Sequence, residues 1–325
     1  MNKFLKKLPF VIYLLIMTLV LLEIGIRFWG YSEHYIYDPI YMTFDKIEDI
    51  SYIHKPNLVN ARGRGFAIVN TDNLGLRSKK TGVQYGPKKN NEYRIAVVGD
   101  SVTFGEGVER TEDTFVQVLG DTLNQKQSAV SVQVFNYGTS AYSVKEMLAT
   151  LQYRVPDVEP DLVLMAIILE DFNLLRTATV DKWGYTVNDS LSGFVSKDSI
   201  IKRMLRKVRL VYLLRDLCYH WFKRSQNVQD SALKNKLPMS YNYVKQFREI
   251  AEEYNLPYII VLLPSLDVQF GTLPEQFGRD EISFIDLSSL RNEFTQDQFR
   301  ASKFDGHPSA MVHRRIGEAL AEHIL

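Results

Sequence analysis

The sequence predicts an α/β protein in which a parallel sheet is covered by helices on both faces. Short apolar runs rich in β-branched residues recur along the chain without alternating with polar residues, as in strands buried on both faces. Helical patterns lie between these runs, which favours a parallel sheet. The chain has 325 residues, 46% of them apolar and 24% charged, so it can bury a sizeable core. At about 150 residues per domain, this length suggests either two units or one large α/β domain with additions.

Five apolar runs give the expected strands, which are Tyr93–Val98, Val130–Phe135, Leu162–Leu169, Tyr258–Leu263 and Ile282–Leu287. The helical patterns between and after them cover Thr114–Gln125, Ser143–Tyr153, Tyr241–Tyr254 and Pro308–Leu325. Chemistry in such a sheet gathers at the carboxyl ends of the strands. Functional side chains are therefore expected directly after the apolar runs.

The first 31 residues form a separate apolar segment. Leu8–Ile26 is close to the roughly 20 residues that a membrane-spanning helix needs. Three lysines within the first seven residues place the N-terminus in the cytoplasm. The alternatives are a buried core helix and a cleaved signal peptide, but no small-x-small cleavage site follows Leu22. We therefore expect residues 1–31 to be a cytoplasmic stub and an uncleaved single-pass anchor, with the remainder periplasmic or otherwise extracytoplasmic.

The rest of the chain divides into a lead-in and a main domain. Residues 32–92 contain many turn residues and predict an irregular, partly β segment packed on the main domain, residues 93–325. A helical insertion at about 176–238 interrupts this domain and is both basic and strongly apolar. We favour the interpretation that this insertion is a lid or a packing helix whose lysines and arginines face water. The alternative is a segment that lies on an anionic membrane surface.

Charge and cysteine content exclude several classes of protein. A net charge of +1 excludes a globally basic nucleic-acid binder. The single cysteine, Cys218, excludes an intrachain disulfide framework and a cysteine-based zinc cluster, and we expect its side chain to be buried. His313 is expected to be solvated on the last helix. We find no third ligand for a metal site that would include it, and expect neither a metal nor a cofactor.

A serine follows the first predicted strand. The loop after Val98 begins Gly99-Asp100-Ser101, lacks the Gly-Lys-Ser/Thr ending of a phosphate-binding loop and does not have dinucleotide-binding glycine spacing. Ser101 is thus either a turn or helix-cap residue or an exposed nucleophile at the carboxyl edge of the sheet.

A histidine near the C-terminus favours the nucleophile. Asp305-Gly306-His307 lies just before the last predicted helix. A serine attacks well only when a base takes its proton, and histidine does this best near neutral pH. Asp305, two residues earlier, can reach the imidazole and fix its tautomer. We therefore predict that Ser101 is a nucleophile, that His307 is its base and that Asp305 is the acid that orients His307.

These motifs resemble those of the SGNH, or GDSL-type, serine hydrolases, over roughly residues 93–325 without the insertion. Gly99-Asp100-Ser101 matches the first block, Asn136-Tyr137-Gly138 the second, and Asp305-Gly306-His307 the last. The resemblance implies a flavodoxin-like three-layer sandwich with a five-stranded parallel sheet. It also implies that Ser101 and Gly138 supply backbone donors to the oxyanion hole. Residues 23–27 and 73–77 resemble membrane-anchored bacterial members, which often act on acyl groups of cell-envelope polysaccharides.

The third block departs from the family pattern. Glu170 stands where the family usually has an oxyanion-donating asparagine, and an ionised carboxylate there would repel the oxyanion. Losing one such donor typically costs about 3–4 kcal/mol. Glu170 can be held neutral by burial and act as a donor, Asn173 can replace it, or the enzyme is slow or uses another acyl acceptor.

We expect a membrane-anchored serine esterase that cleaves an acyl ester, most readily an acetyl ester, on a cell-envelope glycan or small molecule. Transfer of the acyl group to a sugar hydroxyl uses the same residues, so an O-acyltransferase stays open. The alternatives are a non-catalytic glycan-binding or assembly module with the same fold, and a lipid-ester hydrolase with the insertion as its lid.

Overall fold

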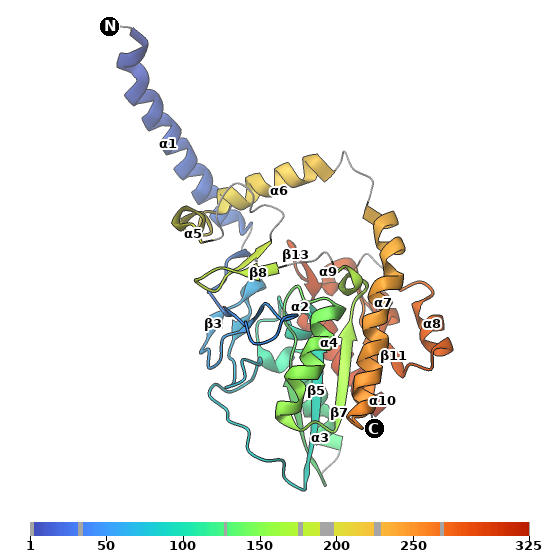
Figure 1. Ribbon diagram of the computed structural model, residues 1–325. Coiled ribbons are helices and arrows are strands. Elements are labelled where there is room, and N and C mark those ends of the chain that lie inside the picture. The colour runs from blue at the N-terminus through green and yellow to red at the C-terminus, as the bar shows by residue number, and fades with distance from the viewer. Residues whose placement is uncertain are drawn as a thin grey trace.

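A five-stranded parallel sheet forms the centre of the protein (Figure 1). The computed structural model describes residues 3–31, 35–126, 129–174, 178–188, 198–223, 229–266 and 270–324. The strands of the sheet are β5 (Glu92–Gly99), β6 (Ser131–Asn136), β7 (Leu162–Ile167), β10 (Tyr258–Leu262) and β11 (Phe284–Asp286). Their order is β11-β10-β7-β5-β6, and every neighbouring pair is parallel. This is the flavodoxin-like order, so the predicted fold class is confirmed.

Helices cover the sheet on both faces and complete three layers. Side chains of β5 alternate between the faces, because Ala96 and Val98 belong to one hydrophobic cluster whereas Ile95 and Val97 belong to the other. The first cluster includes residues of α4 (Val144–Tyr153), α7 (Gln229–Glu253) and α8 (Leu273–Arg279). The second includes residues of α3 (Phe115–Lys126), α9 (Gln296–Phe299) and α10 (Ala310–Ile324).

The N-terminal helix α1 (Lys3–Trp29) projects from this body (Figure 1). Its stretch Lys7–Trp29 has a mean hydropathy of 2.4 and is only 6% buried. It is long and apolar enough to cross a membrane, a property that signal sequences share.

The residues between α1 and β5 form short strand pairs that pack around a hydrophobic cluster of their own. These strands are β1 (Tyr41–Thr43), β2 (Tyr52–His54), β3 (Ala61–Arg62) and β4 (Ile68–Val69), with a 3₁₀ turn η2 (Arg64–Phe66) before β4. The cluster also includes Phe104 and Tyr142 of the main domain. The lead-in is therefore packed against the loops at the carboxyl edge of the sheet.

The remaining elements are short or belong to the inserted segment. Between β7 and α7 the chain forms β8 (Ala178–Val180), β9 (Thr186–Asn188), α5 (Ile200–Leu205) and α6 (Arg209–Lys223). Parts of the predicted insertion, 176–177, 189–197 and 224–228, lie outside the described residues. The short elements elsewhere are α2 (Ser101–Phe104), η3 (Thr111–Asp113), η4 (Val155–Val158), η5 (Leu169–Phe172), η7 (Ser288–Glu293), β12 (Arg300–Ser302) and β13 (Asp305–Pro308).

Two expectations about individual side chains are wrong. His313 is fully buried, and its Nδ1 accepts a hydrogen bond from the N–H of Phe115 at 3.1 Å. That N–H is in the first turn of α3 and has no acceptor within the helix, so His313 caps α3 and joins it to α10. Burial lowers the pKa of His313 to about 3, so the ring is neutral. Cys218 is exposed on α6, because the face of α6 that carries it is not covered by the main domain.

Arg77 joins the lead-in to the loop after α2. The side chain is buried, and its guanidinium donates to the carbonyl oxygens of Gly105 at 2.6 Å and Val108 at 2.8 Å. It also donates to the carbonyl of Phe104 at 3.1 Å. Burial lowers the pKa of Arg77 to about 10, so the guanidinium stays charged at neutral pH. One cation thus holds three carbonyl groups of the loop that follows Ser101.

We predict that Arg77→Ala lowers the free energy of unfolding by about 3 kcal/mol or more, because several buried carbonyl groups lose their donor at once. Urea unfolding of the full chain in mild detergent, followed by circular dichroism, measures this. The matched control is Arg110→Ala, whose side chain is 65% exposed and should change stability by less than about 0.5 kcal/mol. Equal losses in the two variants would contradict the role given to Arg77.

Candidate active site

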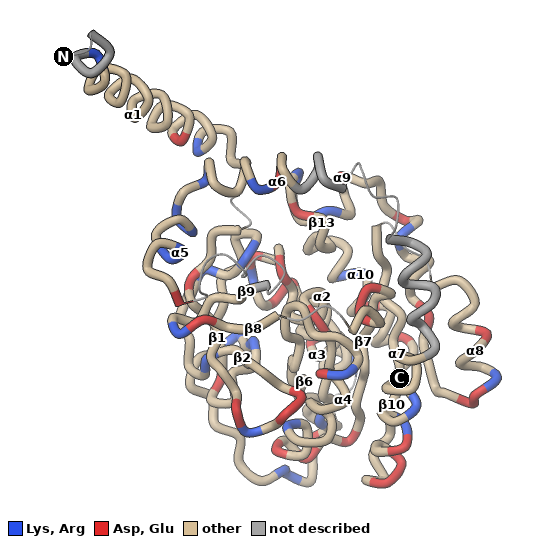
Figure 2. The backbone as a smooth tube through the Cα atoms, turned by 45° about the horizontal axis from the view of Figure 1, so that its top comes forward, with Lys and Arg blue, Asp and Glu red and all other residues tan. Residues whose placement is uncertain are grey.

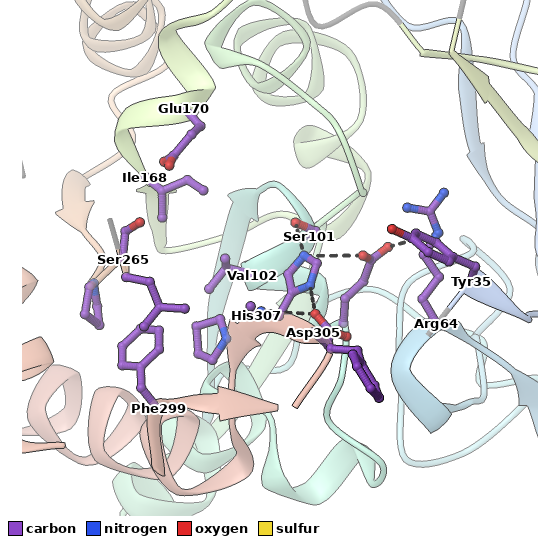
Figure 3. A pocket seen from close by; sticks show the side chains of 16 residues that line it. Tyr35, Arg64, Ser101, Val102, Ile168, Glu170, Ser265, Phe299, Asp305 and His307 are labelled. Carbon is purple, nitrogen blue, oxygen red and sulfur yellow. Dashed lines mark hydrogen bonds and ion pairs between the residues drawn. The ribbon is translucent and has the colours of Figure 1, made fainter. Parts of the chain in front are cut away.

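The site lies at the carboxyl edge of the sheet, where two distant parts of the chain meet (Figure 3). Ser101 is the first residue of α2, and only Asp100 separates it from the end of β5, which lies between β6 and the central strand β7. Asp100 caps this short helix, because its Oδ1 accepts the N–H of Val102 at 2.8 Å. Asp305 and His307 lie on β13, which pairs with β12 and leads into α10. The two ends of the predicted hydrolase segment thus converge at one point.

The three residues predicted to form the catalytic group are linked by hydrogen bonds. His307 Nε2 lies 3.0 Å from Ser101 Oγ, and His307 Nδ1 lies 2.6 Å from Asp305 Oδ1. Asp305 Oδ1 also accepts the backbone N–H of His307 at 3.1 Å. When Nδ1 carries the proton, it donates to Asp305, and Nε2 is free to accept the proton of Ser101. This arrangement can activate a serine for attack on an ester carbonyl.

A second carboxylate, Glu106, faces the imidazole. Its Oε2 lies 3.4 Å from His307 Nε2, and the side chain is only 3% exposed. Its other oxygen, Oε1, accepts a hydrogen bond from Ser140 Oγ and lies 3.9 Å from Nε of Arg64. Glu106 therefore belongs to the same polar cluster as the predicted catalytic residues, although it was given no role from sequence.

The two carboxylates set the charge of the histidine. Burial by itself would lower the pKa of His307, but the hydrogen bond to Asp305 and the negative charge of Glu106 outweigh it and raise the pKa to about 9. The protonated ring is therefore favoured at neutral pH. Its Nε2–H then faces both Ser101 Oγ and Glu106 Oε2.

A cavity of about 390 Å³ opens over these residues. Ser101, Glu106, Asp305 and His307 contribute to its lining, together with Arg64 and Tyr35 of the lead-in. The opposite wall is more apolar and is formed by Val102, Ile168, Pro264, Leu266 and Phe299. Among the described residues, no group of three or more His, Cys, Asp or Glu side chains is placed to hold a metal ion.

Gly138 lies close to α2, the helix that begins at Ser101, but outside the lining of the cavity. A Cβ at this position would meet the backbone nitrogen of Phe104 at 2.2 Å, so the loop after β6 can pack on α2 only with glycine here. The N–H of Gly138 donates to Asn136 Oδ1 at 2.9 Å. Its role as an oxyanion donor stays a prediction.

Glu170 lies in η5 and lines the same cavity. Figure 3 shows it beside Ile168, across the cavity from Asp305 and Arg64. The neighbouring Asp171 is fully buried and accepts the N–H of Ile168 at 2.9 Å, which fixes the turn after β7. The structure therefore brings Glu170 to the cavity, and its effect on an oxyanion stays a prediction.

Two residues of the cluster had only a weak sequence signal. Arg64 lies between two glycines in a stretch whose sequence does not distinguish a solvated turn from a binding site, yet its guanidinium lies over the ring of Tyr37, at 4.9 Å from the centroid, and reaches the cavity. Glu106 follows Ser101 by five residues and lies just after the end of α2. Gly105, at φ +86°, turns the chain there and directs it back toward the histidine. Only the tertiary contact with His307 reveals the function of that turn.

Several solved structures resemble this chain at low identity. One is the lipase/acylhydrolase from Enterococcus faecalis, with 15% identity, a TM-score of 0.40, and coverage of 71% of this chain and 95% of the other. Another is a catalytic mutant of an acetylxylan esterase from Geobacillus stearothermophilus, with 18% identity, a TM-score of 0.40, and coverage of 71% and 94%.

A two-domain esterase active on acetylated mannans has 12% identity, a TM-score of 0.42, and coverage of 71% of this chain and 48% of that one. Sequence identities this low give no information about the substrate of this chain. No curated protein matches the sequence significantly.

The family assignment rests on the sequence. The model of the GDSL-like lipase/acylhydrolase family matches residues 95–320, which is well over half of the chain and includes both segments that meet at the cavity. The chain therefore belongs to the GDSL-like lipase/acylhydrolase family and is a carboxylic ester hydrolase of the GDSL type.

Proposed function

We propose that this protein is a membrane-anchored serine esterase whose nucleophile is Ser101, whose base is His307 and whose orienting acid is Asp305. The observation that carries the proposal is the pair of hydrogen bonds that His307 makes, through Nε2 to Ser101 and through Nδ1 to Asp305. A module that only binds glycans has no need for this geometry.

In the first half of the reaction, Ser101 Oγ attacks the ester carbonyl carbon while His307 Nε2 takes the hydroxyl proton. Asp305 stabilises the imidazolium that forms, and the charge of Glu106 adds to this effect. Ser101 is the first residue of α2, so its backbone N–H has no acceptor within the helix and is available to the oxyanion. Gly138 is the second proposed donor, and in this role its N–H has to leave Asn136 Oδ1, which it binds at 2.9 Å. The intermediate then collapses: the alcohol leaves with the proton from His307, and the acyl group remains on Ser101.

In the second half, a water molecule or a sugar hydroxyl attacks the acyl-serine. His307 takes the proton of the attacking group and returns it to Ser101 Oγ as the acyl group departs. Hydrolysis and transfer differ only in this acceptor. The cavity lined by Glu106, Arg64 and Tyr35 offers hydrogen-bonding groups that suit a hydroxyl-bearing substrate.

The proposed substrate is a short acyl ester, such as an acetyl ester, on a cell-envelope glycan or a related small molecule. The apolar wall formed by Val102, Ile168 and Phe299 suits a small acyl group, whereas the charged wall suits a sugar. We further propose that α1 is an uncleaved single-pass anchor. Three lysines in its first residues favour a cytoplasmic N-terminus and an extracytoplasmic catalytic domain.

The first test is hydrolysis of p-nitrophenyl acetate by the full chain in detergent. Ser101→Ala should lower kcat/KM by about 10⁴-fold or more, because the acyl-serine cannot form. Ser283→Ala, at an exposed serine outside the cavity, should leave the rate unchanged. A rate in Ser101→Ala equal to that of the unaltered chain would overturn the assignment of the nucleophile.

The raised pKa of His307 predicts an alkaline activity profile. A base must be unprotonated in the free enzyme, so kcat/KM should fall about tenfold per pH unit below the pKa of about 9. Glu106→Gln removes a negative charge next to Nε2 and should shift this limb toward lower pH. Glu112→Gln, whose side chain is 46% exposed, is the control and should leave the limb in place. Identical pH profiles of kcat/KM for the two variants would show that the charge of Glu106 does not raise the pKa of His307.

Glu170 provides a test of the oxyanion argument. If its carboxylate repels the oxyanion, Glu170→Asn and Glu170→Gln should both raise kcat, by about tenfold or more for the variant whose amide reaches the oxyanion. If a neutral Glu170 acts as a donor, Glu170→Ala should lower kcat and Glu170→Gln should preserve it. Steady-state kinetics on p-nitrophenyl acetate separates these cases, and an unchanged kcat in all three variants would refute both.

A further inference from the structure

The amphipathic segment α5–α6 is fixed to the end of α1. Glu23, near the end of the apolar run of α1, accepts the backbone N–H groups of Arg209 at 3.1 Å and Leu210 at 2.9 Å. These are the first two N–H groups of α6, which have no acceptor within their own helix. A side chain of α1 therefore caps α6 and fixes the start of α6 beside Glu23.

Two further contacts hold α6 beside α1. Arg27 donates to the carbonyl of Lys207 at 3.2 Å, and Tyr31 donates to Asp216 Oδ2 at 2.8 Å. Figure 1 shows α5 and α6 at the base of α1, with α6 lying across its direction. If α1 crosses a membrane, these contacts keep α5 and α6 at the surface where α1 emerges.

This segment exposes large apolar side chains. Ile200, Ile201 and Met204 of α5 are 67%, 66% and 67% exposed, and their spacing puts them on one face of the helix. Leu214 and Leu217 of α6 are 53% and 57% exposed. A contiguous set of exposed apolar side chains on a folded protein marks an interaction surface.

The same segment is basic, which indicates the kind of partner. Figure 2 shows Lys and Arg along α5 and at the start of α6, near the base of α1. These cations include Lys202, Arg203, Lys207 and Arg209, whereas Arg206 is paired with the buried Asp181 at 3.1 Å and faces the protein. A basic amphipathic helix beside the exit of an apolar helix matches an anionic bilayer surface, where the apolar face enters the acyl region and the cations meet lipid phosphates.

The catalytic cavity adjoins this segment. Phe304, which lines the cavity, packs edge-on against Trp29 and Tyr31 at centroid distances of 5.7 and 5.2 Å. Tyr35, which also lines it, stacks on Tyr212 of α6 at 5.1 Å. A second cavity of about 330 Å³ shares Tyr35, and its lining includes Arg27, Arg206, Lys207 and Arg209.

We propose that α5 and α6 lie on the anionic bilayer surface that α1 enters, with Ile200, Ile201 and Met204 inserted among the lipids. The catalytic cavity then stands at headgroup level, where it meets acyl esters carried by membrane-bound molecules. This inference rests on the proposed anchor and deepens the proposed function.

Cys218 is the only cysteine in the sequence, so replacing it leaves an introduced cysteine as the single site for labelling. In a Cys218→Ser background, a cysteine introduced as Ile201→Cys or Met204→Cys is labelled with an environment-sensitive fluorophore. The full chain is reconstituted in vesicles of phosphatidylcholine and phosphatidylglycerol. An apolar face inserted about 5–10 Å into the bilayer should be quenched about twofold by lipids with a nitroxide on the acyl chain. Lys89→Cys, 77% exposed before β5 at the opposite edge of the sheet, should not be quenched.

Leu15→Cys in the middle of α1 tests the anchor separately. Quenching at position 15 without quenching at position 201 would overturn the surface proposal and leave the anchor intact. Absence of quenching at both positions would overturn both the surface proposal and the proposed anchor. A fluorescence change at position 201 that depends on protein concentration and not on the quencher lipid would show that a second copy covers this face, which also overturns the proposal.

The role of charge has its own test. Lys202→Glu combined with Arg203→Glu should abolish the quenching at position 204 in anionic vesicles, whereas Lys88→Glu combined with Lys89→Glu should not change it. Equal quenching in both double variants would contradict an anionic partner. Hydrolysis of p-nitrophenyl acetate in detergent should persist in all of these variants, so failure of the surface proposal is distinguishable from failure of the esterase proposal.

Discussion

The contact between His307 Nε2 and Ser101 Oγ joins residues that are 206 positions apart, and the rest of the site depends on it. Ser101 lies just after β5, whereas His307 lies on β13, just before the last helix. The contact forms only when β5 is in place between β6 and β7 and α10 is packed on α3. His313 contributes to that packing by capping α3 from α10. No local segment of the chain can therefore hold the site by itself.

The electrostatics of the site follow from two carboxylates that face one imidazole. Asp305 and Glu106 outweigh the effect of burial and favour the imidazolium. In the proposed mechanism, this stabilises the charge that develops on His307 as Ser101 attacks the ester, but it also lowers the fraction of enzyme whose base is unprotonated at neutral pH. The Arg64 guanidinium and Ser140 hydroxyl on Glu106 keep that carboxylate in place. The geometry therefore favours the transition state and restricts the pH range in which it is reached.

The lead-in takes part in the site. Gly65, at φ +62°, approaches so closely that a Cβ there would lie 2.6 Å from Asp305 Oδ2. Arg77 holds the carbonyl groups of the loop after α2, and the Tyr41 hydroxyl donates to Ser140, which in turn contacts Glu106. These contacts make the residues before β5 a support for the catalytic loop. Phe304, which lines the same cavity, packs on Trp29 and Tyr31 and so connects the site to the end of α1.

The sequence by itself determined the parallel sheet, because β-branched runs without alternation are stable only when both faces are covered, as the five strands confirm. It also predicted a nucleophile, an acid and a base at Ser101, Asp305 and His307, and the structure brings the side chains of Ser101 and Asp305 within hydrogen-bonding distance of His307. Only the tertiary structure decided the positions of Glu106, Arg64 and His313. Their neighbours lie far away along the chain, and a local pattern cannot tell a buried charged or polar side chain with a distant partner from one that faces water.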